Sequence, residues 1–397
     1  MILPSFNTRL AFRAWPLLLL VLSASAAAAP RVPQRPDEVL AKLPSSVGVR
    51  PWTEGRAATL LEDPRAAAAA ARVWIEQGRA ELDPRDLGRA QAVLGRWWNL
   101  ASPPAEIRLL RASIRQSLHD FSGALADLDA VTGEEPGNAQ AWLTKSTLHT
   151  LRGEWPAARE AALRLAPLTG RLTSAAAAAA VASVNGQLEE ARELLQAAMR
   201  DDRGASADSI RLWSLTLLGE MAERLGRDSE AERWFRSALS MRHRDAYLLG
   251  AYGDFLLSAG RASDVVSLLR DETRADGLLL RLALAETIID PRSAELARHR
   301  ELLQERFASA RARGDRIHQR EESRFHLHAL RQPVEALRFA QENWNAQKEP
   351  ADVKILLEAG MAAGHSSTVN QVRQWLRDSG LQDVRVERML SSFAAMK

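Results

Sequence analysis

The sequence predicts an all-α solenoid of antiparallel helix pairs, and three observations lead to this prediction. First, the stretch from Ala105 to Pro167 aligns with itself after a shift of 34 residues, so that Ala112 falls on Ser146 and Phe121 on Trp155. Second, apolar and alanine-rich segments of about 12 to 16 residues recur with helical spacing along most of the chain. Third, β-branched clusters are short and lie inside helical spacing. A helix-turn-helix unit is therefore repeated, and each unit is expected to pack mainly on its neighbours.

Residues 1–29 differ from everything after them and are predicted to be a secretory signal peptide. Two arginines precede an apolar run at 17–22, and small residues follow up to Ala29. This order of basic, apolar and small residues predicts export, with cleavage after one of residues 26–28. The alternative is an uncleaved membrane anchor, although the apolar run is shorter than the roughly 20 residues of a spanning helix.

The composition narrows the classes of function. The chain has no cysteine, which excludes a disulfide framework, a lipoprotein anchor and thiol chemistry. Its formal net charge of +3 falls to +1 once Arg9 and Arg13 leave with the signal peptide. Because the mature chain is near charge balance and has no long basic stripe, no nucleic acid partner is expected. No membrane insertion is expected after signal cleavage, and the sequence does not indicate the oligomeric state.

The rest of the chain divides into three predicted parts. Residues 30–61 contain five prolines and are expected to form a lead-in or tether rather than a continuous helix. Residues 62–380 are expected to form an array of about nine helix pairs, clearest at 105–275. Residues 381–397 are expected to form a capping helix that covers the last repeat.

Two kinds of local signal mark the expected helix boundaries. Asp-Pro dipeptides at 63, 83 and 290 each combine a capping side chain with a proline suited to a first helical turn. Glycine allows a tight left-handed exit from a helix. The glycines expected to separate helices are Gly78, Gly153, Gly186, Gly226, Gly260 and Gly364.

The period and the residue pattern together resemble the tetratricopeptide repeat. Two sets of residues match that family's pattern best: Trp142, Ser146, Gly153, Trp155 and Ala158, and then Gly219, Gly226, Ala231, Phe235 and Ala238. Closely crossing helices require a small residue at the contact, and a large neighbour fills the gap beside it. The resemblance implies a right-handed superhelix over about residues 62–380, although the units after Gly277 lose most signature residues.

The resemblance also implies a binding surface, because the first helix of each pair in such proteins lines a concave face. The candidate partner-binding residues are Ser113, Gln116, Ser117, Gln140, Leu143, Thr147, Thr150, Thr216, Glu220 and Glu223. Most of these side chains are short and neutral, which suits hydrogen bonding to a peptide backbone better than clamping a phosphate. The alternative is that this inner face is only solvent-exposed.

No catalytic constellation is predicted, and neither a metal nor a cofactor is expected. The sequence has no phosphate-binding glycine loop, nucleophile elbow or HExxH motif. His318, Glu322 and His326 could share a helix face, but helical rise places the outer two roughly 12 Å apart, too far for one ion. A solvated polar face with Arg320, Glu321 and Arg324 is the preferred interpretation.

Eleven tryptophans could form an aromatic binding platform. Trp97 and Trp98 are adjacent, and neighbours on a helix point about 100° apart, so one can pack inward while the other faces outward. Trp142, Trp155 and Trp234 fall at or near positions that pack between repeats. Core packing is therefore the preferred interpretation.

These observations predict a non-enzymatic, exported scaffold for protein–protein interaction in the bacterial periplasm. Its expected partner is another envelope protein or an extended peptide. The alternative is an accessory subunit of an envelope transport, polysaccharide-export or cell-wall complex. A third hypothesis is an enzyme or metal chaperone that uses residues His318 to His328.

Overall fold

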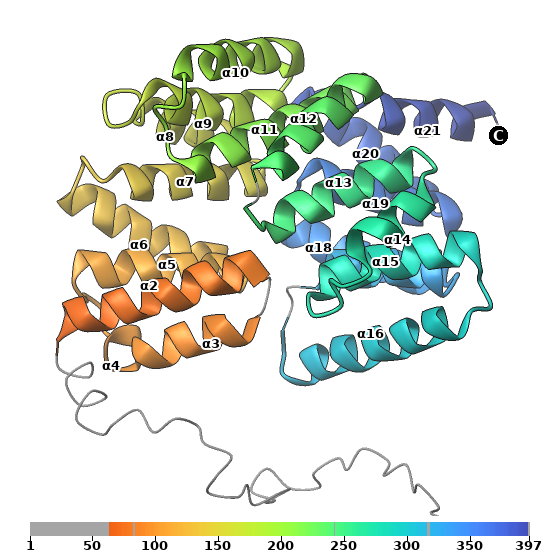
Figure 1. Cartoon of the computed structure of the whole chain (residues 1–397), viewed down its shortest axis with the longest axis horizontal. Coiled ribbons are helices and arrows are strands. Elements are labelled where there is room, and N and C mark those ends of the chain that lie inside the picture. Colours follow the sequence, from red (N-terminus) through yellow and green to blue (C-terminus); the bar gives the residue numbers. More distant parts are fainter. Residues whose placement is uncertain (1–62, 82–83, 242, 316–317, 396–397) are drawn as a thin grey trace, which may run out of the picture. The chain divides into compact units, whose positions relative to one another are not determined.

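The computed structural model describes residues 63–81, 84–241, 243–315 and 318–395, all of which belong to the unit Gly55–Lys397. The predicted signal peptide and proline-rich lead-in lie outside the described residues. Within the described ranges the regular elements are all helices (Figure 1). The prediction of an all-α helical repeat solenoid is confirmed.

The helices follow one another along the chain and are separated by short turns. They are α2 (Pro64–Glu81), α3 (Pro84–Val93), α4 (Gly95–Trp98), α5 (Ala105–Ser117), α6 (Phe121–Glu134), α7 (Ala139–Arg152), α8 (Trp155–Leu163), α9 (Arg171–Ser183), α10 (Leu188–Asp202), α11 (Asp208–Arg224) and α12 (Asp228–Ser240). They continue with α13 (Ala246–Ser258), α14 (Ala262–Leu269), α15 (Asp276–Ile289), α16 (Ala294–Ala312), α17 (Gln319–Arg324), the π-helical turn η1 (Phe325–Ala329), α18 (Pro333–Ala346), α19 (Pro350–Ala362), α20 (Ser366–Ser379) and α21 (Val384–Ala395).

Glycine turns separate most of the paired helices. A positive φ, between 67° and 79°, is adopted by Gly153, Gly186, Gly226, Gly260 and Gly364. A side chain at such a backbone conformation would be strained, so glycine suits these helix ends. The prediction for Gly78 is wrong, because this residue lies inside α2.

Two of the three Asp-Pro dipeptides lie at helix starts, and the third does not. Helices α2 and α3 begin at Pro64 and Pro84. Asp290 instead accepts a hydrogen bond from the Arg292 backbone NH at 3.0 Å and forms a turn. Ser293 then caps α16 by accepting from the Leu296 NH at 3.2 Å, so the helix starts three residues later than the proline predicts.

The core of each pair depends on small residues where two helices cross. Gly219 on α11 faces Phe235 on α12 so closely that a Cβ on the glycine would lie 2.7 Å from the ring. In an earlier pair, the Ser146 hydroxyl on α7 donates to the Ala158 carbonyl on α8 at 3.1 Å. The predicted pairing of a small residue with a large neighbour is confirmed at Gly219 and Phe235.

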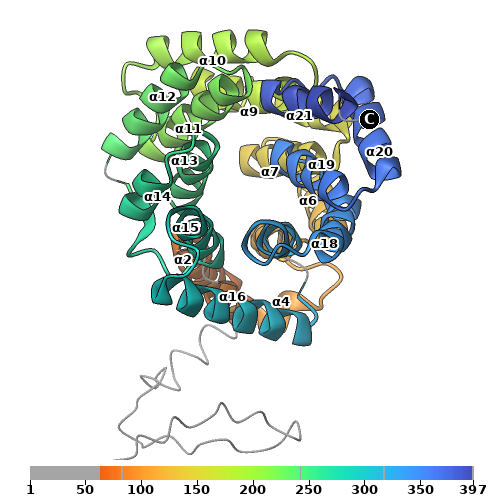
Figure 2. The same cartoon turned by 90° about the vertical axis from the view of Figure 1, so that its right-hand side faces the viewer.

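The first helices of successive pairs line the inner side of the array. Helices α5, α7, α9, α11, α13 and α15 each contact the next helix in this series, and the second helices contact mainly the first helices that flank them. Figure 2 shows α13, α15 and α19 on the inner side and α14, α16 and α20 on the outer side. Side chains on the free faces of the first helices are therefore the candidates for a concave site.

Candidate functional site

Helix α7 carries the clearest polar stripe among the predicted site residues. Gln140, Leu143, Thr147 and Thr150 follow one another at helical spacing and are all at least partly exposed. The Thr147 hydroxyl donates to the Leu143 carbonyl at 3.1 Å, and the Thr150 hydroxyl donates to the Ser146 carbonyl at 2.7 Å. Each hydroxyl oxygen keeps acceptor capacity for a donor from outside the helix.

Helix α5 supplies a smaller polar surface than the sequence predicts. Gln116 and Ser117 are partly exposed, and the Ser117 hydroxyl donates to the Ser113 carbonyl at 3.1 Å. Ser113 itself is buried, and so is Thr216 on α11, whose hydroxyl donates to the Leu212 carbonyl at 2.9 Å. Both side chains turn into the packed helices, so we remove Ser113 and Thr216 from the candidate surface.

The two predicted carboxylates on α11 already have partners within the chain. The Tyr247 hydroxyl donates to Glu220 Oε1 at 2.7 Å. Arg385 on α21 donates to Glu223 and, through Nη2, to Asp228 Oδ1 at 3.0 Å. Burial raises the pKa of both glutamates to about 7, although Arg385 pulls the pKa of Glu223 in the opposite direction.

Stability is expected to increase as the pH falls from about 8 to about 6.5. Glu220 and Glu223 have raised pKa values in the folded chain, so the folded state binds protons that the unfolded state does not. Burial raises the pKa of Glu322 to about 7 and that of Asp352 to about 6, which acts in the same direction. His119, whose pKa is lowered by burial, opposes this trend increasingly as the pH falls toward its ordinary pKa of 6.5.

Urea unfolding followed by circular dichroism at the two pH values measures this effect. The double variant Glu220→Gln/Glu223→Gln should show a smaller increase in the unfolding midpoint than the unaltered chain. Exposed Glu301, changed to glutamine, provides the control, which should keep the full increase. A midpoint that decreases between about pH 8 and about 6.5 would contradict the raised pKa values.

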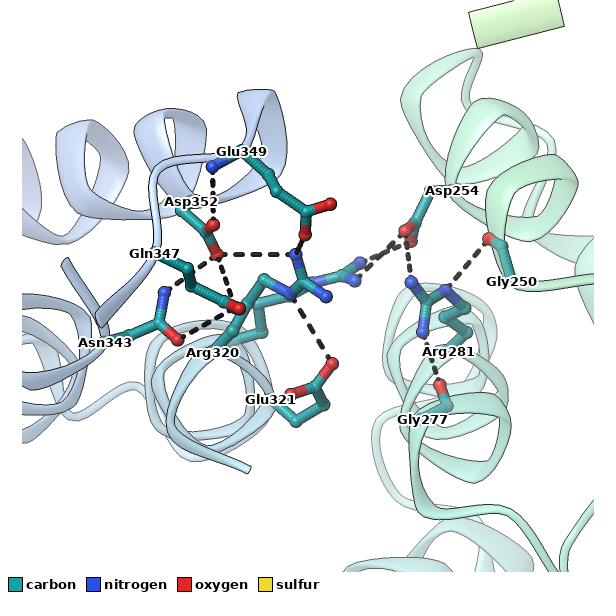
Figure 3. Close-up of polar contacts among 11 residues, drawn as sticks. Gly250, Asp254, Gly277, Arg281, Arg320, Glu321, Asn343, Gln347, Glu349 and Asp352 are labelled. Carbon is teal, nitrogen blue, oxygen red and sulfur yellow. Dashed lines mark hydrogen bonds and ion pairs between the residues drawn. The ribbon is translucent and has the colours of Figure 1, made fainter. Parts of the chain in front are cut away.

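A partly buried ion pair network joins α13, α15 and α17 (Figure 3). Asp254 on α13 accepts from Arg281 Nη2 at 2.5 Å and from Arg324 Nη2 at 2.6 Å. Arg281 also donates to the carbonyls of Gly250 at 3.0 Å and Gly277 at 2.7 Å. Burial alone would raise the pKa of Asp254, but the two arginines outweigh it and hold the pKa well below its usual range.

A second polar network, also drawn in Figure 3, centres on Asp352 at the start of α19. Its carboxylate accepts from the Glu349 backbone NH at 2.8 Å and from Asn343 Nδ2 at 2.8 Å. Arg320 Nη1 donates to Glu349 at 2.7 Å and lies 3.4 Å from Asp352. Burial would lower the pKa of Arg320, but Asp352, Glu321 and Glu349 together raise it well above its usual value.

These two networks correct the interpretation of Arg320, Glu321 and Arg324 as a solvated face. Arg324 reaches Asp254 from 70 residues away in the sequence. The sequence offers no signal for such a pairing, because neither residue belongs to a spaced motif. Carboxylates held by arginines suit a fixed scaffold better than proton transfer.

The three residues of the possible metal set point to different neighbours. Glu322 is buried and paired with Arg311, and His326 stacks on Phe339 with ring centroids 5.2 Å apart. His318 Nε2 lies 3.8 Å from an oxygen of Asp276. In the part of the chain that the structure describes, no group of three or more histidine, aspartate or glutamate side chains is arranged to hold a metal ion.

Among the described tryptophans, Trp97 and Trp155 contribute to packing. Trp97 is buried in the core of the first helices. Trp98 is partly exposed, and the Arg115 guanidinium lies over it, 5.7 Å from the centroid of the Trp98 ring. Trp155 contacts Trp375, with ring centroids 6.3 Å apart, although 220 residues separate the two in sequence. The adjacent pair therefore has one inward and one outward ring, as helical geometry predicts.

Comparison with known proteins supports the repeat assignment for one segment. Residues 171–243 match the family model described as Tetratricopeptide repeat. No curated protein sequence matches the chain. A solved structure described as the crystal structure of the P58(IPK) TPR domain is similar at 13% sequence identity, with a TM-score of 0.21, over 75% of this chain and 99% of that chain.

None of the described helices combines the length and the apolar character needed to cross a bilayer.

Proposed function

We propose that this helical repeat chain, whose residues 171–243 match the tetratricopeptide repeat, is a non-enzymatic scaffold for protein–protein interaction, exported to the bacterial periplasm. It binds an extended segment of another envelope protein along the inner face of α5 and α7. The export step rests on the basic, apolar and small residue order of residues 1–29.

The polar stripe on α7 carries this proposal. Gln140, Thr147 and Thr150 offer amide and hydroxyl groups on one partly exposed face, and Leu143 lies between them. An extended peptide presents unpaired backbone NH and carbonyl groups, which such neutral groups satisfy without selecting a charge. Gln116 and Ser117 on α5 extend the same kind of surface.

An accessory subunit of an envelope transport, polysaccharide-export or cell-wall complex is the alternative. Permanent attachment to such a complex calls for a large contiguous apolar surface. Among the described residues, the exposed large apolar side chains include Val73 on α2, Leu163 on α8, Ile288 and Ile289 on α15, and Val334 on α18. Their spread over several helices favours the scaffold with an exchangeable partner.

Substitution of Thr147 by arginine is expected to reduce partner binding about tenfold or more, because a long cation would fill the stripe where a backbone lies. Affinity capture from a periplasmic extract, followed by titration of a synthetic peptide from the captured protein, measures the change. Gln116→Arg and Gln140→Arg should act in the same direction.

Ser237→Arg is the matched control. Ser237 is exposed on α12, and its hydroxyl donates to the carbonyl four residues earlier at 2.8 Å, as the Thr147 hydroxyl does. Its substitution should leave binding unchanged. Equal capture by Thr147→Arg and the unaltered chain would show that α7 is not the binding face.

A further inference from the structure

Segments of the array that are far apart in the sequence contact each other at three places. The turn between α9 and α10 meets the turn between α20 and α21, which lies five helix pairs further on (α11–α12 to α19–α20). One pair earlier, the Lys348 backbone NH donates to the Leu151 carbonyl at 2.7 Å. Directly after the α20–α21 turn, Arg385 reaches Glu223 at the end of α11. These contacts all join residues 151–228 to residues 348–385.

The two turns fit closely because both contain glycine with a positive φ. Gly186 has φ 79° and Gly380 has φ 69°, and a Cβ on Gly380 would lie 3.1 Å from Gly186 Cα. Beside them, Asn185 Nδ2 donates to the Ser379 carbonyl at 3.1 Å. The C-terminal turn is thus shaped to receive the turn that precedes α10.

The C-terminal segment also completes the start of α10. The N-cap residue Gln187 makes no side-chain capping bond. Instead, Gln382 Oε1 accepts from the Leu188 backbone NH at 3.1 Å, from 194 residues away in the sequence. The Gln382 side chain thereby pairs with one of the backbone NH groups that have no partner within the helix at a helix start.

The same C-terminal part contacts the C-terminal ends of α11 and α13 and the start of α12. Arg385 holds Glu223 and Asp228, and Lys354 Nζ on α19 donates to Ser258 Oγ on α13 at 3.2 Å. Val384 lies so near Gly226 that a Cβ there would be 3.0 Å from its side chain. In this closed arrangement a partner segment has no access to the faces that these contacts cover.

The closing contacts differ in kind from the packing inside the C-terminal part. Helices α18 to α21 share an apolar cluster of buried side chains, among them Leu337, Val369, Val372 and Val386. The contacts to residues 151–228 are chiefly hydrogen bonds and ion pairs. The partly buried side chains of Val184 and Trp155 add apolar contacts. Water can replace such polar contacts at small net cost, whereas exposing the apolar cluster is costly.

We propose that residues 348–385 form a clasp that closes against the C-terminal ends of α11 and α13 and releases them when a partner segment enters. The clasp moves with α18–α21 as one packed body. When the clasp opens, Arg385 leaves Glu223 and Asp228. The entering segment then supplies a basic side chain to these two carboxylates in place of Arg385. This inference rests on the proposed peptide-binding function, which it extends to the chemistry of the partner.

The full chain suits a direct measurement of clasp opening, because it has no native cysteine to label unintentionally. Spin labels at Gln187→Cys and Asp378→Cys, both exposed and next to the joined turns, report the distance between them. The labelled chain should give one short distance. Arg385→Glu, which places a carboxylate against Glu223 and Asp228, should add a population at longer distance.

Two matched variants separate clasp release from a general effect of charge. Exposed Arg388→Glu on the same helix should keep the short distance, and Glu223→Arg combined with Arg385→Glu should restore it. A single short distance in a folded Arg385→Glu variant would overturn the clasp. If Arg385→Glu loses its helical circular dichroism, the unaltered labelled chain is titrated with the peptides (Gly-Arg-Gly)3 and (Gly-Glu-Gly)3.

In that titration the basic peptide should lengthen the distance and the acidic peptide should not. No change with either peptide would overturn the clasp. If the labels separate but no chain variant captures a periplasmic protein, the proposed function fails and the clasp stands.

Discussion

Replacing Phe235 with alanine is expected to lower the free energy of unfolding by about 3–5 kcal/mol. Phe235 is fully buried, and its ring contacts those of Tyr252 and Phe255 with centroids 5.6 and 5.7 Å away. These two partners belong to the next helix pair, so the loss weakens the interface between repeats as well as one repeat. Urea unfolding followed by circular dichroism measures the change.

Variants at Gly219 test the same contact, because this glycine lies close to the Phe235 ring. Gly219→Ala alone should destabilise the chain, because the new methyl group would lie 2.7 Å from a ring carbon. In the Phe235→Ala background the same methyl enters the vacated space, and alanine also favours the helix by about 1 kcal/mol over glycine. The double variant should therefore be more stable than Phe235→Ala.

Exposed Leu194 provides the control for loss of an apolar side chain. Leu194→Ala should change the free energy of unfolding by no more than about 0.5 kcal/mol. If Gly219→Ala destabilises the chain equally with and without Phe235, the two residues do not share the contact that defines this helix crossing.

The sequence predicts this contact because it is local and periodic. Gly219 and Phe235 lie on consecutive helices, and their spacing recurs in other pairs as small and large residues. The same kind of contact between consecutive helices also occurs in units that have lost most signature residues of the repeat. The Ser323 hydroxyl donates to the Ala336 carbonyl at 2.8 Å, as Ser146 does to Ala158.

The candidate site was less predictable than the fold, because its residues depend on how successive pairs rotate. Ser113 and Thr216 follow the family's spacing for an inner face, yet both side chains are buried. Glu223 was predicted as a partner-binding residue, but its contact with Arg385 joins residues 162 positions apart. Such a contact depends on the accumulated turn of several repeats, for which one sequence carries no periodic signal.

Replacing Arg111 with methionine is expected to lower the free energy of unfolding by about 3–5 kcal/mol. Arg111 on α5 is buried and donates to both oxygens of Asp127 on α6, at 2.8 and 2.6 Å. Its third nitrogen donates to the carbonyls of Trp98 at 2.5 Å and Leu100 at 3.0 Å, at the end of α4. Methionine fills a similar volume, but it removes the donors to Asp127 Oδ1 and to the two carbonyls, while Asp127 Oδ2 keeps Arg115.

The double variant Arg111→Met/Asp127→Leu distinguishes the cost of an unpaired charge from the value of the pair. Removing the carboxylate as well should recover at least about 1 kcal/mol relative to Arg111→Met, because no buried charge remains to be compensated. Arg115, which also binds Asp127 at 2.8 Å, keeps the Gly123 carbonyl at 3.0 Å as an acceptor. A double variant less stable than Arg111→Met would instead mean that Asp127 stabilises the α5–α6 pair through Arg115 alone. The same urea titrations measure both variants, with exposed Arg388→Met as the control for loss of an arginine.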